Sequence, residues 1–197
     1  TPSFEEAAAL YGDKDFTAAR AIAEPLANEG DARAMAMLGA MYQSGNGVAA
    51  DLNLAVQWYG KAAEAGHAAA QYALAMIYLG DGLGQPDFTA GSKWLEKAAV
   101  AGDVEAQFTM GLLNSGAFGN PPDWTIAAGW YARAAARGHA EAQYNLGLLH
   151  LDGKGVERDP VEAATWVGKA AAQGLPDAAL DYGVMVFRGE GVKKDEK

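Results

Sequence analysis

The chain has 197 residues, half of them hydrophobic, and a formal net charge of −10 at pH 7. This charge argues against a nucleic-acid partner, whose phosphates attract basic proteins, and it makes basic proteins or peptides the favoured charged partners. The absence of cysteine excludes disulfides, cysteine-ligated zinc and thiol chemistry. No apolar run approaches the roughly 20 residues that a membrane-spanning helix needs.

Residues 1–30 predict a short, degenerate pair of helices. Asp15 is the expected N-cap of the second helix, Ile22 stands where later segments have tryptophan, and Gly30 closes the pair. The first residues contain neither the basic n-region nor the apolar h-region of a signal peptide. Because Thr1 is not a natural initiator, we expect a processed or shortened chain.

Four segments with one 36-residue pattern follow, at 31–66, 67–102, 103–138 and 139–174. Self-similarity at such a period is typical of stacked repeats, in which each unit packs only on its neighbours. The clearest marker is a tryptophan at the same place in every segment. These tryptophans are Trp58, Trp94, Trp130 and Trp166.

The first half of each segment predicts a helix, with apolar residues at helical spacing. A small residue recurs at its ninth position: Gly39, Ala75, Gly111, Gly147 and, in the trailing fragment, Gly183. Glycine costs about 1 kcal/mol relative to alanine inside a helix, so its recurrence indicates a tight helix contact. Glycine-rich text then ends the helix. It lacks the Gly-Lys-Ser/Thr of a phosphate loop and predicts turns with positive φ.

The second half predicts another helix. A recurring aspartate is its expected N-cap, at Asp51, Asp87, Asp123 and Asp159. The tryptophan lies midway and is expected to wedge between its own repeat and the next, with an aromatic ligand platform as the alternative. A lysine or arginine three residues later suits the C-terminal end of the helix dipole.

Residues 175–197 match the first helix of a further repeat. The match ends at Asp195, where the second helix should begin. Stacked repeats need a polar outer cap. We therefore expect either that the natural chain continues beyond Lys197 or that self-association covers this end. The second possibility gives a homo-oligomer through the truncated C-terminal helix.

The text Gln143-Tyr144, Gly147, Trp166 and Lys169-Ala170-Ala171, with its copies, resembles the Sel1-like repeat, a relative of the tetratricopeptide repeat. The resemblance covers 31–174 fully. It implies an all-α fold, a right-handed α/α superhelical solenoid of antiparallel helix pairs, with all the segments forming one solenoid domain. Departures are Met35 in place of glutamine, Gly91 in place of alanine, and a third loop without its Gly-x-Gly-Val.

Family members are generally adaptors that bind other proteins, often in bacterial regulation or signalling, so the resemblance implies a protein–protein interaction scaffold. Many members are periplasmic or secreted, which favours those compartments, with the cytoplasm as the alternative. A self-associating structural or targeting arm of a larger protein is the second reading. A cell-wall hydrolase, once proposed for some members, is the least favoured.

In family members the first helix lines the concave face, and positions 3, 7, 10 and 14 of each repeat share one stripe. These positions include Leu148 and Val184. The candidate partner-binding residues are Arg33, Met37, Met76, Glu105, Thr109, Leu112, Glu141, Asn145, Asp152, Asp177, Asp181 and Arg188. Early repeats are apolar and later ones acidic. We expect either a ligand with an apolar and a basic end, or ordinary solvated surface.

The sequence does not favour an enzyme, a cofactor or a metal site. His139 and His150 lie eleven residues apart on one predicted helix, so about 16 Å of rise separates them. His67 begins a distant repeat. No Ser-x-x-Lys, Gly-x-Ser-x-Gly or His-Glu-x-x-His occurs.

Overall fold

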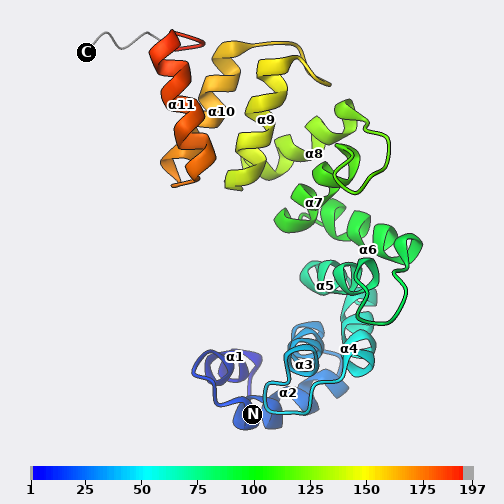
Figure 1. Ribbon diagram of the computed structural model, residues 1–197. Coiled ribbons are helices and arrows are strands. Elements are labelled where there is room, and N and C mark those ends of the chain that lie inside the picture. The colour runs from blue at the N-terminus through cyan, green and yellow to red at the C-terminus, as the bar shows by residue number, and fades with distance from the viewer. Residues whose placement is uncertain (1, 193–197) are drawn as a thin grey trace. The chain divides into compact units, whose positions relative to one another are not determined.

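The structure is a computed structural model that describes residues 2–192 (Figure 1). Within those residues the chain forms eleven α-helices and no strand. The helices are α1 (Phe4–Gly12), α2 (Phe16–Asn28), α3 (Ala32–Ser44), α4 (Leu52–Glu64), α5 (Ala68–Leu79), α6 (Phe88–Val100), α7 (Val104–Asn114), α8 (Trp124–Ala136), α9 (Ala140–Asp152), α10 (Pro160–Ala172) and α11 (Pro176–Arg188).

The chain divides into two compact units, Thr1–Asp103 and Val104–Lys197. In the first unit α1 pairs with α2, α3 with α4, and α5 with α6. In the second, α7 pairs with α8 and α9 with α10, and α11 packs on α10 (Figure 1). The prediction of an all-α fold built from consecutive helix pairs is confirmed.

The recurring aspartates cap the second helices. Asp51 accepts a hydrogen bond from the backbone N–H of Leu54 at 3.0 Å, and Asp159 accepts two, from Val161 and Glu162. Two first helices are capped by histidine, α5 by His67 and α9 by His139, which was not predicted from the sequence. Asp195, where a further second helix was expected to begin, lies outside the described residues.

The small residues at the ninth position lie where the two helices of a repeat approach closely. A Cβ added at Gly39 would lie 2.7 Å from the Tyr59 ring, and one at Gly147 would lie 2.6 Å from Val167. Gly111 meets Tyr131 in the same way. At Gly183 the expectation of a tight contact is wrong, because nothing lies within 4 Å of an added Cβ. The described residues contain no second helix after α11 that could press on it.

The four periodic tryptophans are half-buried, and Trp58, Trp94 and Trp166 pack toward the preceding repeat. Trp58 of α4 packs on a cluster from α2 and α3, and Trp166 of α10 packs on one from α8 and α9. For Trp58 and Trp166, the expected contact with their own repeat is confirmed, and the expected contact with the next repeat is wrong, because the second contact is with the preceding repeat. The second helix closes on the groove between its own first helix and the helix before it, so the indole fills that groove.

The cation three residues after each periodic tryptophan lies over the indole ring, at 4.4 Å for Lys61, 4.3 Å for Lys97, 4.5 Å for Arg133 and 3.9 Å for Lys169. These distances are within the range of a cation–π interaction. The repeated cation therefore contacts the repeated tryptophan, in addition to its favourable place near the helix C-terminus.

Candidate partner-binding face

The first helices of the second unit, α7, α9 and α11, border two cavities. The larger has a volume of about 280 Å³. It is lined by Leu112 and Ser115, by Trp124 and Tyr131 of α8, by Asn145, Leu148, Leu149 and Asp152 of α9, and by Lys154. Its lining combines aliphatic and aromatic side chains with a few polar groups. This composition is typical of pockets that bind small molecules or single side chains.

Polar groups of the larger cavity are already oriented by the protein. The Tyr131 hydroxyl lies 3.3 Å from the Ser115 hydroxyl, and burial raises the pKa of Tyr131, so that the phenol stays neutral. At the rim, the Lys154 ammonium lies 2.9 Å from an Asp152 carboxylate oxygen and 5.5 Å from the centre of the Trp124 ring. A guest would therefore meet an apolar wall and a rim with both charges.

The smaller cavity, of about 170 Å³, shares Leu148 with the larger one. Its other lining residues are Leu151, Val167, Asp181, Val184, Met185, Arg188 and Glu190. The Tyr144 hydroxyl donates to Asp181 at 2.8 Å. Burial, with added effects of Asp181 and Asp177, raises the pKa of Tyr144 to about 12. Both carboxylates therefore act on this phenol, and they place negative charge beside the cavity.

The structure brings some of the predicted contact residues together. Leu112, Asn145 and Asp152 line the larger cavity, and Asp181 and Arg188 line the smaller one.

Glu105 and Glu141 lie on either side of the His139 ring, each with a carboxylate oxygen 3.4 Å from a ring nitrogen. Asp177 is exposed in the first turn of α11. Thr109 is buried and donates to the Glu105 carbonyl at 2.8 Å, so its prediction as a surface contact is wrong.

The predicted residues of the first unit are arranged differently. Arg33 pairs with Glu5 at 2.9 Å and lies 4.5 Å over the Phe4 ring, so contacts within the unit occupy its guanidinium. Met37 is half-buried against the cluster of α2 and α3. Met76 of α5 is exposed.

Several residues that line the larger cavity were not predicted from the sequence. Tyr131 and Trp124 come from a second helix, while only first helices were considered. A signal was present, because Trp124 is the one tryptophan that breaks the 36-residue spacing. Lys154 comes from a loop that we interpreted only as a turn.

Residues 2–192 contain no group of three or more histidine, aspartate or glutamate side chains placed to hold a metal ion. None of the helices there has both the length and the apolar character needed to cross a membrane.

The repeated helix pairs, with their caps, close glycine contacts and tryptophans, match the Sel1 repeat. The family's sequence model matches 32–67, 68–103, 104–139, 140–175 and 176–197. The chain belongs to the Sel1 repeat family. No curated protein matches its sequence.

Solved structures of Sel1 repeat proteins are similar over most of the chain. A Sel1 repeat protein from Oxalobacter formigenes has 30% identity and a TM-score of 0.88, covering 98% of this chain and 79% of its own. A protective antigen with an SLR fold from uropathogenic Escherichia coli has 34% identity and a TM-score of 0.85 over 98% of this chain; the match spans 42% of the antigen. A Sel1 repeat protein from Klebsiella pneumoniae has 26% identity and a TM-score of 0.58, covering 92% of this chain and 90% of its own.

Membership in the family gives the general class of function. The Sel1 repeat is typically a non-catalytic scaffold, and Sel1 repeats generally mediate interactions between proteins. The two cavities on the first helices of the second unit are therefore candidate contacts for a partner protein.

Proposed function

We propose that this chain is a non-catalytic adaptor that binds a segment of a partner protein along α7, α9 and α11. The observation that supports the proposal best is the pair of neighbouring cavities that share Leu148. A segment with two anchoring side chains could fill both. Anchors held in pockets commonly carry most of the binding energy of such contacts.

The chemistry of the lining describes the partner. The larger cavity suits an apolar or aromatic side chain against Leu112 and Trp124. Two carboxylates, Asp181 and Glu190, against one cation, Arg188, line the smaller cavity and favour a lysine or arginine there. We therefore propose a ligand with an apolar residue followed by a basic one, bound on the concave face in the manner of the family. A role in bacterial regulation belongs to the same proposal.

A single substitution at the shared wall tests the proposal. Affinity capture from extract of the source organism would use the wild-type chain, Leu148→Arg and a matched control, Ile126→Arg, whose side chain is exposed on α8 outside both cavities. The proposal predicts a protein that wild type and the control retain and that Leu148→Arg loses. Equal capture by Leu148→Arg, with an unchanged circular dichroism spectrum, would contradict it.

Charge reversal tests the basic end of the ligand separately. A variant with lysine at Glu105, Glu141, Asp177 and Asp181 is expected to release the partner, and 0.5 M salt (about a 4 Å Debye length) is expected to weaken wild-type binding. If neither the charge reversal nor the salt weakens capture, the basic residue of the proposed ligand is excluded and only its apolar anchor remains.

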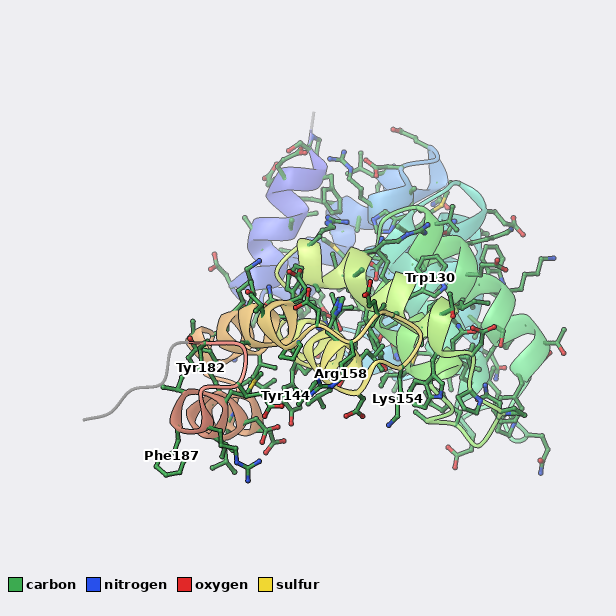
Figure 2. All side chains as sticks on the ribbon, turned by 90° about the horizontal axis from the view of Figure 1, so that it is seen from above. Trp130, Tyr144, Lys154, Arg158, Tyr182 and Phe187 are labelled. Carbon is green, nitrogen blue, oxygen red and sulfur yellow. The ribbon has the colours of Figure 1, made fainter. Side chains whose placement is uncertain are left out.

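A self-associating arm is the second candidate function. It is supported by Leu180, Val184 and Phe187, which are 69%, 38% and 73% exposed on α11. Figure 2 shows Phe187 pointing away from the rest of the second unit. Sedimentation at increasing concentration would detect a dimer, and Phe187→Glu is expected to abolish it. A monomer at every concentration would exclude this candidate.

A further inference from the structure

A glutamine near the start of the first helix ties two successive repeats together. Gln71 donates from Nε2 to the Ala63 carbonyl at 3.0 Å, and Gln143 donates to the Ala135 carbonyl at 3.1 Å. Both glutamines are buried, with 7% and 5% of their surface exposed. The two repeats thus use the same amide for the same bond.

The side-chain oxygen of this glutamine has a hydrogen-bond donor in one repeat and none in the other. Gln143 Oε1 accepts a hydrogen bond from Gln173 Nε2 at 2.8 Å, and the same nitrogen donates to the Gly138 carbonyl at 2.9 Å. Gln71 Oε1 is buried and has no hydrogen-bond partner among the described residues. A buried carbonyl oxygen without a donor is unfavourable.

The sequence explains this difference. Ala101 stands where the 139–174 repeat has Gln173, so the 67–102 repeat keeps the acceptor and lacks the donor. In the 31–66 repeat the pair is Met35 and Ala65, which has neither group, and in the 103–138 repeat Arg137 supplies a donor type at this position. Among the four full repeats, glutamine at the fifth position together with alanine at the thirty-fifth occurs only in the 67–102 repeat.

The protein surface is hollowed at the same place. A cavity of about 530 Å³ is lined by Gln71, Lys93, Glu96, Lys97, Val100 and Ala101. Of these residues Gln71 alone is buried, so it forms the inner wall, while Val100 is 69% exposed at the rim. The space that a glutamine side chain would occupy at position 101 is therefore accessible from outside.

We infer that this cavity is a second docking site, which takes the side-chain carboxamide of an asparagine or glutamine from a partner protein. The amide nitrogen donates to Gln71 Oε1 and to the carbonyl of Gly66, the counterpart of Gly138. Its oxygen accepts from the Lys93 ammonium, and its methylene groups contact Val100. Two cations, Lys93 and Lys97, against one carboxylate, Glu96, leave the lining net positive, which disfavours a cationic donor and selects a neutral amide. None of these residues belongs to the face of α7, α9 and α11.

The test uses the tripeptide Ala-Gln-Ala, blocked by an acetyl and an N-methylamide group, in a ¹H–¹⁵N NMR titration of the full chain. We expect saturable shifts of the Gln71 side-chain amide and of the backbone from Lys97 to Ala101. The matching Ala-Glu-Ala peptide lacks the donor, and its binding is expected to be about tenfold weaker or more. Free glutamine that bound as tightly as the peptide would overturn the choice of a protein partner.

Two variants test whether the cavity binds a carboxamide side chain or binds nothing. Ala101→Gln supplies the donor from within, so it is expected to raise the melting temperature and abolish the peptide shifts. Gln173→Ala opens an equivalent cavity at Gln143 and is expected to add a second set of saturable shifts there. No saturable shift in the wild-type chain, or the same shift in Ala101→Gln, would overturn the inference.

Discussion

The 67–102 repeat of the first unit and the 139–174 repeat of the second share the same frame. Asp87 and Asp159 cap their second helices, and in each a lysine lies over the repeated tryptophan. The two repeats differ at positions whose residue type does not recur every 36 residues. Gln143 has a donor for its oxygen, whereas the oxygen of Gln71 has none among the described residues.

The first helices of the two units differ in the same way. Arg33 is held by Glu5 and Phe4 within the first unit, whereas in the second unit Leu112, Asn145 and Asp152 line a cavity completed by the non-periodic Trp124. The comparison teaches that periodic residues build the scaffold. In both comparisons the two units differ at residues that depart from the period.

The largest expected effect concerns a periodic tryptophan. Trp166 packs on the α8–α9 cluster and donates to Glu162 at 2.8 Å. Trp166→Ala is expected to lower the free energy of unfolding by about 3 kcal/mol, the low end for tryptophan because the ring is half-buried. Urea denaturation measures this. A loss below about 1 kcal/mol would contradict the scaffold role of the periodic residues.

A pair of alanine substitutions compares the same repeat position in two surroundings. Gly147→Ala is expected to cost about 1–3 kcal/mol, because the new Cβ would meet Val167 at 2.6 Å and the Ala163 carbonyl at 3.1 Å. Gly183→Ala enters open space and is expected to stabilise by up to about 1 kcal/mol through helix propensity. Equal effects in urea denaturation would refute the difference between the two positions.

Removing an aspartate N-cap tests whether the capping residue contributes equally to stability in the two units. Asp87→Ala and Asp159→Ala are each expected to cost about 1 kcal/mol. Asp159 accepts from two backbone N–H groups and Asp87 from one, so the second-unit variant should lose slightly more. Matched Asp→Asn variants, which keep a capping oxygen, should lose less than either alanine variant.

Alkaline pH gives the smallest effect. Burial raises the pKa of Tyr59 from its usual 10.0 to about 12. Because the folded chain keeps this phenol neutral to higher pH, its contribution to stability is complete below pH 10 and is lost as pH rises toward 12. Tyr59→Phe loses the hydroxyl contact with Gln43 but should lose less stability than wild type over this range. Parallel urea titrations at pH 9 and pH 11 measure the difference.

The sequence predicted what depends on local or periodic chemistry. The helix pairs, the caps at Asp51 and Asp159 and the close contacts at Gly39 and Gly147 all follow from short-range rules that repeat four times. The family resemblance was equally readable, because it rests on the same positions.

Features that depend on neighbours in space were not predictable. The period places Trp58 on a helix but does not say which neighbouring repeat the ring contacts. The cavities needed second-helix residues such as Trp124 beside first-helix residues such as Asn145. The difference between Ala101 and Gln173 is visible in the sequence, yet it gains meaning only once Gln71 and Gln143 are known to lie beside those positions.

The central claim is that a partner protein contacts the non-periodic residues of α7, α9 and α11. Photo-crosslinking tests it most directly, with benzoylphenylalanine in place of Asp152 at the rim of the larger cavity and, as the control, in place of the exposed Thr165 on α10. The account predicts a crosslinked partner from position 152 and none from position 165. Crosslinks from position 165 alone would contradict it and place the binding surface on the second helices.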